Sequence, residues 1–120
     1  MNAGPRALIA YVISRMVTGK QSSHVYDFSD SRYRPVSGTV TSTNVNVFDH
    51  QESCHLTGSG TKSNMSLYHY GIGAYISLKV TNNQFTGYDY GSGQHFTGNV
   101  SGSSISIYDY GPGRFFNYQI

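Results

Sequence analysis

The chain from Ser22 to Ile120 is built from five copies of one pattern about 20 residues long. Each copy begins with an aromatic residue, followed by Asp or His and then by a second ring-bearing residue. The five triplets are Tyr26-Asp27-Phe28, Phe48-Asp49-His50, Tyr68-His69-Tyr70, Tyr88-Asp89-Tyr90 and Tyr108-Asp109-Tyr110. Their first residues are 22, 20, 20 and 20 positions apart. This regularity indicates one small supersecondary unit repeated in tandem.

Apolar and polar residues alternate inside each copy, as in Ile105-Ser106-Ile107 and Phe96-Thr97-Gly98. A period of two predicts β-strands. Glycine-rich segments such as Gly91-Ser92-Gly93 divide the two apolar runs of a copy, and polar pairs such as Asn82-Asn83 divide one copy from the next. Both segment types favour tight turns. Each copy is therefore predicted to be a β-hairpin, and five copies predict about ten antiparallel strands in a meander.

The first copy contains two more residues than the others. We expect these residues in the loop around Ser29 to Pro35, with the copy rejoining the common register at Val36 and Val40.

The segment in front of the repeats has a different period. Leu8, Ile9, Val12, Ile13, Met16 and Val17 recur at spacings of three and four residues. Pro5 suits a first helical turn and Gly19 suits the position after a helix end. This pattern predicts one α-helix over residues 5–18 with a wide apolar face.

Ten strands and one short helix limit the architecture. An open ten-stranded sheet is roughly 48 Å wide at the usual strand spacing, whereas a 14-residue helix is about 21 Å long. The helix would leave most of the apolar face exposed to water and both edge strands of the sheet unpaired. We therefore predict a single all-β domain over residues 1–120, folded as a closed or nearly closed barrel with the helix plugging or capping it. Association through free sheet edges is the alternative.

Composition and charge exclude several classes. The net charge is +2 and the Lys and Arg residues are scattered, so nothing suggests a nucleic-acid-binding stripe. The apolar run over residues 7–13 is too short for a membrane span and lacks a signal-peptide cleavage pattern. A cytoplasmic location is the default expectation. Cys54 is the only cysteine, so no internal disulfide forms.

The acidic residues of the triplets occupy one equivalent position: Asp27, Asp49, Asp89 and Asp109, with His69 in the third copy. One interpretation is a ring of carboxylates that binds a cation or a hydroxylated ligand. The other is structural, with each Asp capping the N–H groups of its own turn. Equivalent residues lie roughly 10 Å apart, too far to share one metal ion. The structural interpretation is preferred.

The paired tyrosines form the candidate binding surface: Tyr68 and Tyr70, Tyr88 and Tyr90, Tyr108 and Tyr110. Alternation places both members of a pair on the face opposite the aliphatic residues. Tyrosine is common on sugar-binding and protein-binding surfaces because it combines a flat apolar ring with a hydroxyl. The alternative is cross-strand packing that only stabilises strand register.

The second copy departs from the pattern because its turn lacks both glycines. The residues in and around this turn include Asp49, His50, Glu52, Cys54 and His55, and His69 follows one copy later. Asp49, His50, Cys54, His55 and His69 are residue types that ligate zinc, although their spacing matches no known motif. A Cys–His nucleophile is the related catalytic hypothesis. A drifted repeat with no cofactor explains the same residues.

Three functions remain open. The first is a non-catalytic binding module that takes a glycan or a protein on its tyrosine-rich face. The second is a structural subunit that forms homo-oligomers through its aromatic face or its sheet edges. The third is a metal-dependent enzyme that uses the second copy.

Overall fold

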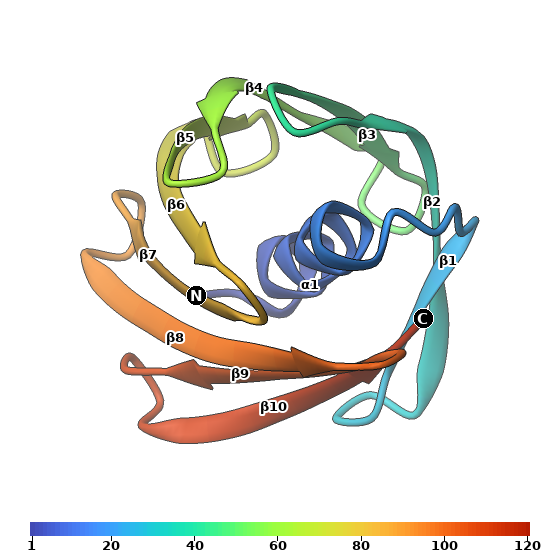
Figure 1. Ribbon diagram of the computed structural model, residues 1–120. Helices are drawn as coiled ribbons and strands as arrows, with labels where there is room; N and C mark the ends of the chain where they lie inside the picture. Colours follow the sequence, from blue (N-terminus) through green and yellow to red (C-terminus); the bar gives the residue numbers. More distant parts are fainter.

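The computed structural model describes residues 1–120 as one helix inside a closed ten-stranded antiparallel barrel (Figure 1). Each strand pairs with its neighbours in sequence, and the last strand pairs with the first. The elements are α1 (Ala3–Thr18), β1 (His24–Asp27), β2 (Arg32–Val40), β3 (Asn44–Asp49), β4 (Cys54–Thr61), β5 (Asn64–His69), β6 (Ala74–Thr81), β7 (Gln84–Asp89), β8 (Gln94–Ser101), β9 (Ser104–Asp109) and β10 (Arg114–Gln119). The predicted closed barrel of five hairpins is confirmed.

Alternation along each strand separates an inner from an outer face. On β5, Met65 and Leu67 are fully buried inside the barrel, whereas Ser66 is exposed on its outer wall. The same alternation runs through the other copies, so their aliphatic residues share one interior. Burial of this apolar surface is the main driving force for closure.

The helix α1 fills the barrel, as Figure 1 shows along the barrel axis. It is buried on all sides from Gly4 to Ser14, because the wall surrounds it completely. It begins two residues earlier than expected and ends as predicted: Gly19 adopts φ 70° and donates its N–H to Arg15 O at 2.9 Å. This helix lacks the length and apolarity needed to cross a bilayer.

All five hairpin turns end in a residue with a left-handed backbone conformation. The last residue of each turn has positive φ: Ser31 (51°), Ser53 (54°), Gly73 (65°), Gly93 (71°) and Gly113 (69°). Copies three to five use glycine here, which adopts this conformation without strain. The first two copies have serine at this position, and it also adopts positive φ without a glycine.

The prediction that the two extra residues of the first copy lie in its loop was wrong, whereas the expected return to the common register at Val36 and Val40 is confirmed. Tyr26 lies opposite Tyr33 as Tyr68 lies opposite Tyr75, so the first turn has the common length. The extra residues instead lie within β2. Arg34 pairs with Val25 as Leu56 pairs with Val47, whereas Val36 pairs with Asp49 as Leu56 pairs with His69, so the register shifts by two residues between Arg34 and Val36. A longer turn would lose the hydrogen bond from its backbone N–H to Asp27, whereas a strand can accommodate extra residues through a shift in register.

Two glycines make room for large rings inside the barrel. Phe85 is paired with Gly98 and Gly87 with Phe96, across β7 and β8. A Cβ on Gly87 would lie 2.2 Å from the ring of Phe96, and one on Gly98 would lie 2.5 Å from the ring of Phe85. Each ring therefore covers the glycine opposite it, and the two phenylalanines fill this part of the interior.

Candidate functional site

The four aspartates of the triplets lie inside one mouth of the barrel and are at most 2% exposed. In each, Oδ1 accepts a hydrogen bond from the backbone N–H two residues later, at 2.9–3.0 Å. His69 has a related role in the third copy, where Nδ1 accepts from Ile72 N–H at 3.1 Å. These side chains are thus engaged by their own turns.

Two of the aspartates also neutralise buried arginines. Arg6 of α1 donates to Asp109 Oδ2 at 2.9 Å and to the hydroxyl of Tyr118 at 3.1 Å. Arg34 of β2 donates to Asp27 Oδ2 at 3.2 Å. These pairs occupy the mouth of the barrel, which leaves Asp27 and Asp109 committed to internal contacts.

The outer wall carries an aromatic triad in every copy. We define a triad as a central ring, the ring two residues later and the ring seven residues later on the paired strand. The triads are Tyr26/Phe28/Tyr33, Phe48/His50/His55, Tyr68/Tyr70/Tyr75, Tyr88/Tyr90/His95 and Tyr108/Tyr110/Phe115. Both flanking rings meet the central ring edge-on, with centroids 4.6–4.9 Å apart and interplanar angles of 65–77°.

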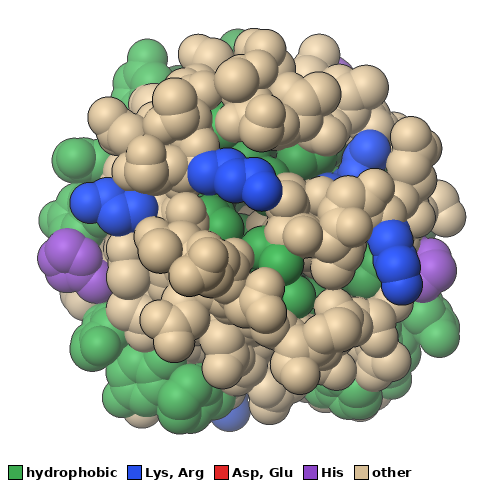
Figure 2. Space-filling view, in the orientation of Figure 1, with side chains coloured by type: hydrophobic (Ala, Val, Ile, Leu, Met, Phe, Trp, Pro, Cys, Tyr) green, Lys and Arg blue, Asp and Glu red, His purple; other side chains and the backbone are tan.

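Within a triad the central ring is half-buried and the flanking rings are exposed. All seven exposed large hydrophobic side chains of the protein are flanking rings, and they are 53–64% exposed: Phe28, Tyr33, Tyr70, Tyr75, Tyr90, Tyr110 and Phe115. The predicted tyrosine pairs therefore lie outside the barrel. Figure 2 shows hydrophobic and His side chains projecting in separate groups around its circumference.

The third member of each triad was not anticipated. Tyr33, His55, Tyr75, His95 and Phe115 share one position, seven residues after the central ring, but their residue types differ from copy to copy. A search for ring-bearing residues at a fixed offset, without regard to type, would have found them.

Three grooves run beside the triads, at equivalent positions of the first, third and fourth copies. Their volumes are about 430, 770 and 680 Å³. The first-copy groove is lined by His24, Tyr26, Phe28, Tyr33, Gln119 and Ile120, and the third-copy groove by Thr57, Gly58, Ser59, Ser66, Tyr68, Tyr70 and Tyr75. The fourth-copy groove is lined by Asn64, Ser77, Leu78, Lys79, Thr86, Gly87, Tyr88, Gln94, His95, Phe96, Thr97 and Tyr110.

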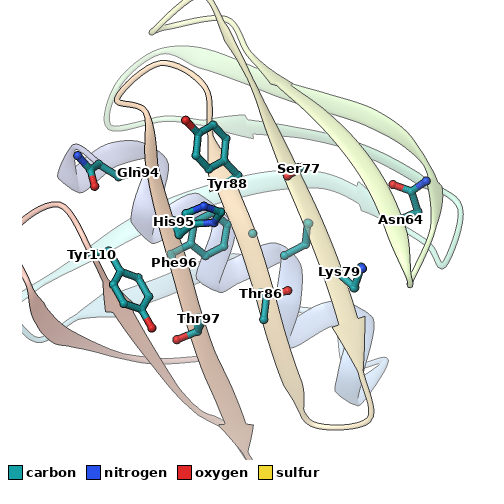
Figure 3. Close-up of a pocket in the computed structure, with 12 residues that line it drawn as sticks. Asn64, Ser77, Lys79, Thr86, Tyr88, Gln94, His95, Phe96, Thr97 and Tyr110 are labelled. Atoms are coloured by element: carbon teal, nitrogen blue, oxygen red, sulfur yellow. The ribbon is translucent and has the colours of Figure 1, made fainter.

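In each groove one wall is aromatic and the other polar. In the fourth-copy groove, Figure 3 shows Tyr88 and His95 on neighbouring strands, with Thr86 and Thr97 further along the same strands. The opposite wall comes from the preceding copy, through Ser77 and Lys79 here. Thr57 and Ser59 form the corresponding wall of the third-copy groove.

The grooves contain almost no charge. Lys79 is the only Lys, Arg, Asp or Glu side chain that lines any of the three. Of the six acidic residues, four are buried inside the barrel, and Asp30 and Glu52 lie in hairpin turns. The barrel end seen in Figure 2 shows Lys and Arg side chains and no Asp or Glu.

A fourth cavity of about 410 Å³ lies at the barrel mouth near the start of α1, and Glu52, Cys54 and His69 are among its lining residues. Cys54 Sγ lies 3.8 Å from His69 Nε2. Because Nδ1 of His69 accepts the Ile72 N–H, the neutral imidazole carries its proton on Nε2 and points it at the sulfur.

Neither Cys54 nor His69 lies in surroundings that favour its charged form. Burial raises the pKa of the Cys54 thiol, and nearby Asp49 raises it further. Burial lowers the pKa of His69. A catalytic thiolate–imidazolium pair requires the opposite shifts, so this geometry supports a neutral hydrogen-bonded pair.

The five residues considered as zinc ligands do not converge. Asp49, Cys54 and His69 face the interior, whereas His50 and His55 pack against Phe48 on the outer wall. No group of three or more His, Cys, Asp or Glu residues is placed to hold a metal ion. A metal on Nε2 of His69 would also need the proton on Nδ1, which faces the Ile72 N–H.

Comparison with known proteins adds no relative. No protein-family model matches the chain, and neither a curated protein nor a solved structure matches it. The fold and the outer wall define the protein as a closed barrel of β-hairpin repeats with aromatic grooves on its outside.

Proposed function

We propose that the protein is a non-catalytic binding module that takes glycans in the grooves of its outer wall. The observation that carries this proposal is the repeated pairing of exposed rings with uncharged polar side chains. Three equivalent grooves combine an aromatic wall with Ser, Thr, Asn or Gln residues.

The rings offer the apolar half of a sugar site. A pyranose has a face of C–H groups that packs on a flat aromatic ring, and a tyrosine ring combines such a surface with a hydroxyl. Tyr75 is 57% exposed and Tyr70 is 59% exposed beside the third-copy groove. Both side chains are therefore accessible to a ligand.

The opposite walls offer the polar half. Thr57, Ser59 and Ser66 in the third-copy groove provide hydroxyls that both donate and accept hydrogen bonds. Sugar hydroxyls need such two-way partners. A few placed polar groups beside an apolar surface are the usual composition of a small-molecule site.

The triads also hold these rings in place before a ligand arrives. The central ring of each triad is clamped edge-on by two neighbours, as Tyr68 is by Tyr70 and Tyr75. A side chain that is already fixed loses less conformational freedom on binding. Such fixed rings suit shallow sites, because a small buried surface offers little binding energy to offset a loss of conformational entropy.

The distribution of the rings favours a glycan over a protein partner. A protein interface usually has one contiguous apolar core. Here the rings stand in five separate triads, and polar residues such as Thr57 and Thr97 lie between them. Several small ligands, or one extended ligand, fit this pattern better than one flat surface.

Screening of the purified protein on a glycan array, followed by NMR titration with the best ligand, tests the proposal. We expect shifts at the triads of the first, third and fourth copies. Tyr75→Thr should remove the shifts of the third-copy groove, whereas Lys62→Ala, in a turn outside the grooves, should leave binding unchanged. Absence of any glycan ligand, or shifts confined to the barrel mouth, would refute a glycan site on the wall.

Homo-oligomer assembly is the competing function, and the seven exposed rings are what favours it. Closure pairs β1 with β10 and leaves no free sheet edge, so assembly would have to use the aromatic face. Sedimentation at low concentration separates the two functions. A tight oligomer together with an empty glycan array would favour assembly.

A further inference from the structure

We infer that the third-copy and fourth-copy grooves form one continuous subsite for a linear, uncharged oligosaccharide that crosses β5 and β6. This inference rests on the proposed glycan function. It goes beyond that function by naming the shape and charge of the ligand and the two copies that bind it together.

The two grooves adjoin on the same pair of strands. Ser66 of β5 lines the third-copy groove, and Asn64, two residues earlier on the same face, lines the fourth-copy groove. Tyr75 and Ser77 of β6 have the same relationship. No strand separates the grooves, so one ligand can pass from one to the other.

The spacing of the triads sets the length of that ligand. Tyr75 lies opposite Tyr68, whereas Ser77 lies opposite Tyr88, so consecutive triads are offset by two residues along the strands. Two strand spacings combined with this offset place the backbones of Tyr68 and Tyr88 about 12 Å apart. The rings outside the barrel diverge further. One sugar unit cannot span this distance, but a chain of several units can.

The course of the fourth-copy groove also fits an extended ligand. Figure 3 shows Asn64 at one end and Tyr110 at the other, with Tyr88, His95 and Thr97 between them. The barrel measures 30 × 29 × 28 Å and is nearly round. A stiff sugar chain therefore leaves the convex wall after a short arc, so we limit the subsite to these two neighbouring grooves.

The lining selects an uncharged chain. Lys79 is the only charged side chain in the two grooves, and no carboxylate lies in either. A polyanionic glycan would need repeated cationic partners along the path, whereas the positions present are Ser, Thr, Asn and Gln. Binding should therefore depend little on salt.

Calorimetric titration with neutral oligosaccharides of increasing length, in the linkage class found on the array, tests the inference. We expect weak binding of the disaccharide and a gain of about tenfold or more once the chain reaches both grooves, followed by a plateau. Affinity should change less than about twofold between roughly 0.05 M and 0.5 M salt. Equal affinity for all lengths, or a steep loss with salt, would overturn the inference.

Matched variants test which groove is responsible for the gain in affinity with chain length. Tyr75→Thr should abolish the gain with chain length while the fourth-copy groove still binds the disaccharide. Tyr33→Thr, at the equivalent position of the first copy, should remove one site from the stoichiometry and keep the gain. A gain that survives Tyr75→Thr would overturn the bridged subsite. Failure of every glycan to bind would instead refute the proposed function itself.

Discussion

Arg34 donates a hydrogen bond from Nε to Oδ2 of Asp27 at 3.2 Å inside the barrel, where the equivalent hairpin positions of the other copies hold Leu56, Ile76, Phe96 and Phe116. Arg34 and Asp27 have side chains 4% and 1% exposed. Asp30 and Glu52 also lie within reach of the guanidinium, although Nη1 makes no hydrogen bond. An arginine thus occupies an interior position that is apolar in the other four copies, and Asp27 supplies its counter-charge.

Replacing only one member of this pair should be costly. We expect Arg34→Leu to lower the free energy of unfolding by about 3–5 kcal/mol, because it leaves the carboxylate of Asp27 buried without its cation. Adding Asp27→Asn should restore part of that loss, since the amide oxygen can still accept the Ser29 N–H. Denaturant unfolding of both single variants and the double variant measures the coupling. Additive effects of the two substitutions would contradict a direct pair.

Stability should depend on pH through His69. Burial lowers the pKa of His69 in the folded state, whereas an unfolded histidine titrates near about 6.5. Below that pH the unfolded chain binds the proton first, so the free energy of unfolding should fall as the pH drops from about 6.5 to the lowered pKa. Stability above pH of about 6.5 should be unaffected by this residue. His69→Asn keeps an acceptor for the Ile72 N–H but cannot titrate, and it should flatten the slope. An unchanged slope in chemical denaturation would exclude His69 as its source.

Serine in the left-handed turn position should limit stability in the first two copies. We expect Ser53→Gly to raise the free energy of unfolding by about 0.5–1 kcal/mol, because glycine adopts φ near 54° without the Cβ strain. Ser31→Gly should act similarly. Ser29→Gly, in the same turn as Ser31 but without positive φ, is the control and should be neutral or destabilising. Equal effects at Ser29 and Ser31 would argue against backbone strain as the cause.

Gly87 should not tolerate a side chain. In Gly87→Ala the new Cβ would meet the ring of Phe96 at 2.2 Å and the carbonyl oxygen of Ser77 at 2.5 Å. We expect a loss of about 1–3 kcal/mol or more from overpacking, seen as a lower midpoint in thermal unfolding. Gly91→Ala is the matched control, because its nearest atoms lie at 3.2 Å and its φ is not positive. Similar midpoints for the two variants would contradict close packing at Gly87.

Much of the fold could be predicted because its determinants are local. The alternation around Ile105 and Ile107 predicts a strand, and the offset of 20 residues between Tyr88 and Tyr108 predicts the repeat. The burial of Arg34 could not be predicted in this way. An arginine in an alternating strand is ordinarily placed at the surface, and only its contact with Asp27 across the hairpin makes the interior acceptable.

The candidate site was predictable only in part. The pairs such as Tyr68 and Tyr70 were visible as neighbours two residues apart, and the structure places them outside the barrel. Tyr75 joins them because the turn folds β6 back on β5, and the groove needs Thr57 and Ser59 from the preceding copy. Contacts between residues on adjacent strands depend on the strand register, and the order of residues along the chain does not specify that register.

The amino-acid sequence by itself determined the hairpin unit, its fivefold repetition and the division of every strand into an apolar and a polar face, because these follow from which residues lie two positions apart. Tertiary structure alone decided that α1 lies inside the barrel and does not cap one mouth, that two buried arginines pair with the turn aspartates, and that adjacent copies enclose grooves. Those features require contacts between segments far apart in the chain, and their geometry exists only once the strands have aligned around a filled interior.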